Sequence, residues 1–218
     1  MILTIDIGNT SKKYYLFQGE KIIDRGSWVN ENELPKASKV IASNVSGYQL
    51  KLKASSPKDL FKNGFFLDMP VHYEKTLGED RLVCAYYVYK SFETPSICID
   101  LGTFTTIDVI SKNGFMGGHI LPGVNLIKES YSKGHDLSFP HLKNLESKAP
   151  QKTADAINTG AQIAITAPIQ NILDSYKDYN VILTGGHAFE IKEFFTFKFE
   201  HQENLLAMAL NFISKEMG

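Results

Sequence analysis

The sequence has few of the residues that mark several large classes of protein. It holds two cysteines, Cys84 and Cys98, which form no CxxC pair, and their apolar neighbours predict buried thiols. Its six histidines show no metal-ligand spacing, and no apolar stretch reaches the ~18 residues of a membrane span. The formal net charge of -1 gives no basic field for nucleic acid. We therefore expect a cytoplasmic protein without nucleic-acid or membrane partners.

The two common nucleotide-binding fingerprints, GxxxxGK[ST] and GxGxxG, are also absent. Another pattern occurs twice instead. "IDIGNT" begins at residue 5 and "IDLGTFTT" begins at residue 99, so that Asp6 and Asp100 each close an apolar strand ahead of a glycine. This repeat predicts two α/β lobes, residues 1–93 and 94–218, that pack closely with a cleft between them.

Apolar periodicity predicts the same order of elements, strands and then a helix, in both halves. Thr153 is the expected N-cap of the longest helix. The first half is expected to hold strands at 2–7, 13–17, 20–29 and 39–45 and a helix at 78–92. The second half is expected to hold strands at 97–101, 106–111, 115–120, 180–186 and 194–200, and helices after Pro122-Gly123, at 153–176 and at 203–217.

The repeated turn has the chemistry of a phosphate site. Glycine lets the backbone approach a phosphate, and Asn and Thr add donors of short reach. A carboxylate at a strand end can hold a cation, and Lys13 on the returning strand can reach a phosphate oxygen. Asp, Gly and Asn are also ordinary turn residues, so one copy alone favours a plain hairpin. Two copies at matching positions favour phosphate binding.

These motifs resemble a known superfamily. "DIGNTSKK" (6–13) and "DLGTFTT" (100–106) resemble the two phosphate motifs of the actin/hexokinase/Hsp70 ATPases, and "ILTGG" (182–186) resembles their adenosine motif. Within it, the sequence is most similar to type III pantothenate kinase. The segments that carry this resemblance, in the family's order, are "GEDR" (78–81), "GGHILPG" (117–123) and "KTADAINTG" (152–160). The resemblance implies an α/β fold of duplicated ribonuclease-H-like lobes, each a mixed sheet with helices, around a nucleotide cleft.

The resemblance also implies an activity and its residues. The family transfers the γ-phosphate of ATP to the primary hydroxyl of pantothenate, giving 4'-phosphopantothenate, the first step of coenzyme A synthesis. Asp80 would accept the hydroxyl proton, Asp6 would lie near Mg²⁺, and Asp100 would hold a monovalent cation, K⁺ or NH₄⁺. The ATP-binding residues would be Asp6, Ile7, Gly8, Asn9, Thr10, Ser11, Lys12, Lys13 and Thr103. The pantothenate pocket would be formed by Tyr73, Gly78, Glu79, Asp80, Arg81 and Thr153. The resemblance further implies a homodimer.

Plainer interpretations stay open at each position. Asp80 can be a first-turn helix acid, Arg81 a surface ion-pair partner, Tyr73 a core residue and Thr153 only an N-cap. For the whole chain, the alternatives are a sugar or acetate kinase, an accessory transcription regulator of the same fold, and a filament or chaperone ATPase. The presence of both Asp80 and Asp100 favours catalysis, because a protein that only binds needs no base.

Overall fold

The computed structural model describes residues 1–135, 137–144 and 149–217. The chain forms two compact units, and strands β8, β9 and β10 pass from one unit into the other. The predicted lobe boundary between residues 93 and 94 stays a prediction. Unit 1 comprises Met1–Cys98, Asp108–Gly117 and Asn204–Gly218, and unit 2 comprises Ile99–Ile107 and Gly118–Glu203.

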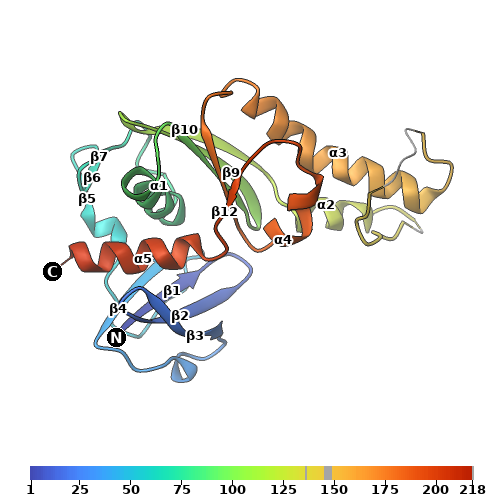
Figure 1. The fold of residues 1–218 in the computed structure, drawn as a ribbon. Helices are drawn as coiled ribbons and strands as arrows, with labels where there is room; N and C mark the ends of the chain where they lie inside the picture. The colour runs from blue at the N-terminus through green and yellow to red at the C-terminus, as the bar shows by residue number, and fades with distance from the viewer. Residues whose placement is uncertain (136, 145–148, 218) are drawn as a thin grey trace. The chain divides into compact units, whose positions relative to one another are not determined.

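Unit 1 is built on a four-stranded sheet of order β3-β2-β1-β4 (Figure 1). β1 is antiparallel to β2, which places Asp6 opposite Lys13, and parallel to β4, which places Ile7 beside Asn44. Helix α5 packs against β1 and β4. The fully buried β1 side chains Leu3 and Ile5 belong to an apolar cluster with Leu16, Trp28 and Ala42. The elements are β1 (Ile2–Ile7), β2 (Lys12–Gln18), β3 (Lys21–Ser27), β4 (Lys39–Asn44) and α5 (Leu205–Glu216).

Unit 1 also contains helix α1 (Glu79–Ser91), which packs against α5. Ahead of α1 lies a small sheet of order β5-β6-β7, in a region whose mixed sequence gave no pattern. Its strands are only two residues long, too short for a period to be visible. The remaining elements are the 3₁₀ helices η1 (Glu31–Glu33) and η2 (Pro57–Leu60) and the strands β5 (Phe61–Lys62), β6 (Phe65–Phe66) and β7 (Met69–Pro70).

The second sheet repeats the order of the first. Its order, β10-β9-β8-β11-β12, again places the first strand of the set between the second and the fourth. The repetition confirms the predicted fold class of duplicated lobes with mixed sheets and helices. The strands are β8 (Ser96–Leu101), β9 (Phe104–Ser111), β10 (Gly114–Pro122), β11 (Asn180–Thr184) and β12 (Glu200–His201), and the helices of unit 2 are α2 (Val124–Tyr131), α3 (Thr153–Leu173) and α4 (Ala188–Ile191).

Two local predictions are wrong. Thr153 is the first helical residue of α3, and the N-cap is Lys152, whose carbonyl accepts the amide of Ala156. The alternating segment 194–200 is not a strand, because the 3₁₀ helix η3 (Lys192–Phe194) runs into it and pairing begins only at β12. There the aromatic rings pack on one another, with centroids 4.7 to 6.3 Å apart: Phe195, Phe197 and Phe199.

Other predictions hold. Cys84 and Cys98 are both buried thiols, as their apolar neighbours predicted. In the parts of the chain that the structure describes, no helix combines the length and the apolar character that crossing a membrane requires.

Candidate active site

The first phosphate motif forms the hairpin turn between β1 and β2. The amide of Gly8 donates to the carbonyl of Ser11 at 3.0 Å and closes the turn. Asn9, Thr10 and Ser11 are exposed at its tip. A Cβ at Gly8 would meet only ordinary contacts, the nearest being the Ser11 carbonyl oxygen at 3.4 Å. The fold therefore does not itself require glycine here, which agrees with a glycine that makes room for a ligand.

Asp6 lies at the carboxyl end of β1, partly buried. The pKa of Asp6 is raised to about 6, mainly by burial; the charge of Lys13 opposes this increase and the charge of Asp80 adds to it. A carboxylate in this state is stabilised in its charged form by a nearby cation. Mg²⁺ in phosphotransferases is usually held by one or two carboxylates together with substrate phosphates and water. Asp6 with the adjoining turn hydroxyls fits that donor set, and the described residues hold no cluster of three or more metal-ligating side chains.

Lys12 and Lys13 have different surroundings. The Lys12 ammonium lies 3.7 Å from the ring centroid of Tyr48 and 4.9 Å from that of Trp28. Tyr48 is itself held by Glu31, which accepts its hydroxyl proton at 3.2 Å. Lys12 thus binds two aromatic faces, whereas Lys13 lies beside Asp6. This aromatic pair was not predictable from local sequence patterns, because Tyr48 and Trp28 are far apart along the chain.

Asp80 lies in the first turn of α1, and its carboxylate folds back onto the backbone. The amide of Arg81 donates to Asp80 Oδ1 at 2.8 Å. A Cβ at Gly78 would lie 2.6 Å from the same oxygen, so the glycine of "GEDR" makes this carboxylate position possible. Burial raises the pKa of Asp80, although the Arg81 amide and the Arg81 charge lower it. Asp80 is therefore a stronger base than an exposed aspartate.

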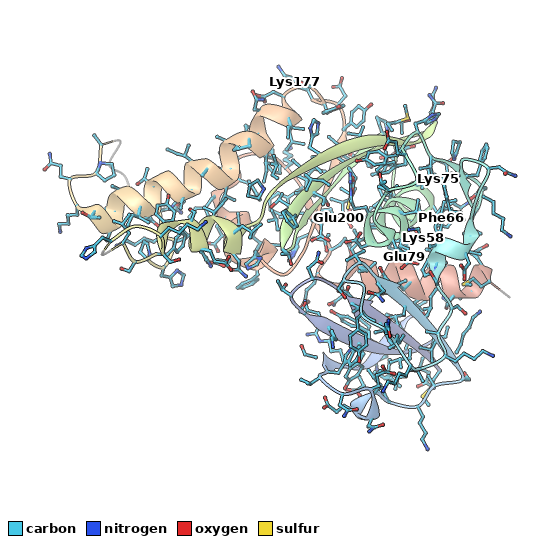
Figure 2. The ribbon with its side chains drawn as sticks, turned by 180° about the vertical axis from the view of Figure 1, so that it is seen from behind. Lys58, Phe66, Lys75, Glu79, Lys177 and Glu200 are labelled. Carbon is cyan, nitrogen blue, oxygen red and sulfur yellow. The ribbon has the colours of Figure 1, made fainter. Side chains whose placement is uncertain are left out.

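Glu79, next to Asp80, joins three elements of unit 1. Its buried carboxylate accepts the amide of Asn44 at 3.0 Å, the hydroxyl of Ser56 at 2.5 Å and the amide of Lys58 at 2.8 Å. Figure 2 shows Glu79 and Lys58 side by side. Because Asn44 is the β4 neighbour of Ile7, Glu79 ties the first turn of α1 to the strand ends that carry the phosphate turn.

Arg81 is buried and paired. Its Nε and Nη2 donate to Asp108 Oδ1 at 2.9 and 2.5 Å. Its Cζ lies 5.3 Å from the ring centroid of Tyr73 and 5.9 Å from that of Phe115. Burial lowers the pKa of Arg81, but Asp108 outweighs it and the pKa stays above its ordinary value. Arg81 is therefore not a surface ion-pair partner.

The second phosphate motif forms the turn between β8 and β9 in unit 2. Gly123 packs so closely on this turn that a Cβ there would overlap the carbonyl oxygens of Gly102 and Thr103. Gly185, at φ +101°, approaches Asp100 and the Leu101 backbone in the same way. The "ILPG" and "LTGG" segments thus enclose the "DLGT" turn from two sides, and only glycine allows the approach.

The predicted site residues therefore fall into two groups. Unit 1 assembles the first turn, the "GEDR" segment and Tyr73, whereas unit 2 holds Asp100, Thr103 and Thr153, which is exposed at the start of α3. Sequence reasoning gave no role to Asp108. A signal was present, since "TTIDVI" places a carboxylate inside an apolar strand, where a charge needs a partner.

The fold is one of duplicated α/β lobes, each a mixed sheet with helices, and each of the two units carries one of these glycine-containing turns. Among solved structures, a conserved protein from Campylobacter jejuni titled as a Baf family transcriptional activator has a TM-score of 0.65, 23% identity, and coverage of 99% of this chain and 98% of that one. A Sinorhizobium meliloti protein titled as a 2-dehydro-3-deoxygalactonokinase has a TM-score of 0.60, 9% identity, and coverage of 99% and 96%. At these identities the similarity shows the fold alone.

The sequence comparisons identify the family. The type III pantothenate kinase family model matches residues 50–175. The type III pantothenate kinase of Flavobacterium johnsoniae is 30% identical over 212 residues, 86% of each chain. That of Campylobacter hominis is 28% identical over 220 residues, 100% of each chain. The chain belongs to the type III pantothenate kinase family.

Proposed function

We propose that this protein is an ATP-dependent pantothenate kinase, which forms 4'-phosphopantothenate and ADP. The observation that carries the proposal is the family match over residues 50–175, which includes both "GEDR" and "DLGT". The type III pantothenate kinase of Campylobacter hominis aligns with this chain over 100% of both sequences.

The first turn is proposed to bind the triphosphate of ATP. Its exposed residues Asn9, Thr10 and Ser11 carry short-range donors, and Lys13 adds a positive charge. Asp6 would hold Mg²⁺, whose charge neutralises the phosphate oxygens during transfer. In unit 2, Thr103 would contact ATP from the second turn, which Gly123 and Gly185 keep in place.

Asp80 is proposed as the proton acceptor. The pantothenate hydroxyl oxygen forms a bond to the γ-phosphorus, while the bond from that phosphorus to the bridging oxygen of ADP breaks. The hydroxyl proton goes to the Asp80 carboxylate. Burial raises the pKa of Asp80, which makes it a better acceptor, and the Arg81 amide fixes the orientation of the carboxylate. Such a base contributes about 10²–10⁴ in rate.

The pantothenate pocket is proposed to include Tyr73, Gly78, Arg81 and Thr153. Glu79 would contribute backbone atoms, because its carboxylate is occupied by three hydrogen bonds within the protein. Arg81 is a fixed donor next to the base, and pantothenate carries a carboxylate and an amide that need donors.

Two further features are proposed on the family resemblance: a K⁺ or NH₄⁺ ion at Asp100 and a homodimer. The cytoplasmic location is proposed from the sequence composition given above. For the dimer, α3 exposes Ile163 at 59%, an apolar residue that a partner can cover. Light scattering of the purified protein would give the oligomeric state.

The deciding experiment uses purified protein, ATP, Mg²⁺ and K⁺, with and without pantothenate. ADP that forms only with pantothenate, together with a product heavier by one phosphoryl group, supports the kinase. ADP formed equally with glucose or acetate would point to another kinase of the superfamily. The accessory regulator has in its favour only a structural neighbour at 23% identity, and nothing specific to the site supports it.

A further inference from the structure

Strand β9 carries a buried charge that the proposed reaction does not use. Asp108 is 2% exposed and lies between Ile107 and Val109 in the core. It accepts both hydrogen bonds of Arg81 on one oxygen. A buried ion pair adds little net stability compared with apolar residues of similar size, so its presence in this core points to another role.

Arg81 is fixed by more than this pair. Its guanidinium lies next to the rings of Tyr73 and Phe115, which contact each other edge to face at 5.8 Å. Through its backbone amide, Arg81 also holds the carboxylate of Asp80. One residue therefore connects Asp108 in β9 to the proposed base in α1.

We propose that Asp108 is a positioning residue of the phosphoryl transfer: it anchors Arg81, and through Arg81 it sets the orientation of Asp80 and the charge beside it. The inference rests on the proposed function, because Asp108 can position a base only if Asp80 is that base. The pKa of Asp80, which tests the inference, can be measured without turnover. Asp108 does not touch the reacting atoms in this scheme.

The charges around Asp80 predict the direction in which its pKa changes in each variant. Asp80 interacts with Asp6 on β1, with Glu79 and Arg81 on its own helix, and with Asp108 on β9. Arg81 favours the ionised form of Asp80, and the negative charge of Asp108 offsets part of that effect. Removing only the charge of Asp108 therefore lowers the pKa of Asp80, whereas removing both members of the pair raises it.

The test compares the full-length wild type with Asp108→Asn and with the double variant Arg81→Met/Asp108→Leu, in which no buried charge is left unpaired. Initial rates are measured against pantothenate at saturating MgATP, so that the ionisation of Asp6 does not enter the profile. For Asp108→Asn we expect kcat/KM for pantothenate to fall about tenfold or more and KM for ATP to change less than about twofold. The same rates are measured over a range of pH. In the profile of kcat/KM against pH, the acidic limb of Asp108→Asn should move to lower pH by about 0.5–1 unit, and that of the double variant should move to higher pH.

The matched control is Asp68→Asn. Asp68, which lies between β6 and β7, also pairs with a cation of α1, Lys90, at 2.7 Å. Asp68 is exposed, and Lys90 lies at the opposite end of α1 from Asp80. This variant should keep the wild-type kcat/KM and the wild-type limb. A purely structural role of Asp108 would lower the melting temperature without moving the limb in either direction.

The second readout does not need turnover. The carboxyl ¹³C resonance of Asp80, followed by NMR against pH in the same variants, should titrate at lower pH in Asp108→Asn and at higher pH in the double variant. Unchanged or parallel shifts would overturn the inference even if the kinase is active. A wild type without pantothenate-dependent ADP would overturn the proposed function and leave the titration still decisive. If Asp108→Asn does not fold, Asp108→Glu takes its place, because it keeps the charge but displaces Arg81; a wild-type kcat/KM in a folded Asp108→Glu would overturn the inference.

Discussion

Replacing Asp6 by asparagine is expected to make the protein more stable at neutral pH while it destroys the proposed magnesium site. The pKa of Asp6 is about 6 in the folded protein, against an ordinary value of 3.8. The folded state therefore binds this proton more tightly than the unfolded state does, and stability falls as pH rises from about 4 to about 6. At about 1.4 kcal/mol per pKa unit, the ionised Asp6 costs the fold up to about 3 kcal/mol at pH 7.

Asp6→Asn removes that cost, and part of the gain is lost because the amide must also find partners. We expect an increase of about 1–3 kcal/mol in the free energy of unfolding at pH 7, or about 2–10 °C in melting temperature. The advantage should vanish near pH 4, where wild-type Asp6 is protonated. Asp24→Asn, which removes an exposed carboxylate of the same sheet, is the matched control and should change stability by less than about 0.5 kcal/mol.

The assay is thermal unfolding at several pH values, with and without MgATP. MgATP should stabilise the wild type and leave Asp6→Asn unchanged, because the variant has lost the carboxylate that holds the metal. The reasoning is refuted if Asp6→Asn is less stable than the wild type at pH 7. It is refuted equally if the difference is the same at pH 4 and pH 7.

Four other outcomes are expected. Asp80→Asn should bind ATP normally in calorimetry but lose about 10²–10⁴ in kcat, and near-normal turnover would place the base elsewhere. Glu79→Ala should lower the free energy of unfolding in denaturant by about 3–5 kcal/mol, because three donors lose their acceptor. Glu79→Gln should lower it by less, because its amide oxygen can still accept. Replacing K⁺ by Na⁺ should lower turnover in the wild type, and Asp100→Ala should remove the difference; a preserved cation preference would exclude Asp100 as the ligand. Trp28, the one tryptophan of the chain, should change its emission on ATP binding if Lys12 leaves its ring, and Lys12→Met should abolish that change.

The sequence was sufficient for the duplicated sheets because their strands are long and apolar. The runs at 2–7 and 97–101 were interpretable as strands without reference to any partner, and their matching Asp-x-Gly endings predicted two similar lobes. The strand order within each sheet was not predicted. The prediction from sequence was wrong where apolar and polar residues alternate outside a sheet. In 194–200 the alternating phenylalanines pack on one another, and a local pattern cannot distinguish that cluster from one face of a strand.

The site residues were identified by motif, but their surroundings were not predictable from it. A carboxylate near a helix N-terminus and beside an arginine is ordinarily ionised, so the sequence alone favours an ionised Asp80. The structure adds burial, which acts in the opposite direction and raises the pKa. Asp108 lies 27 residues from Arg81 along the chain, so only the fold reveals that the two form a pair.

The electrostatics of unit 1 predict how the proposed site would respond to MgATP. Burial raises the pKa of three carboxylates, Asp6, Asp80 and Asp108, and the charge of Asp80 raises that of the other two. Lys13 and Arg81 each lower the pKa of a carboxylate beside them, yet burial remains the larger effect in all three cases. A cation brought in with ATP would relieve the repulsion at Asp6 and thereby lower the pKa of Asp80. Nucleotide binding would then leave Asp80 ionised, the protonation state in which it can accept the hydroxyl proton of the second substrate.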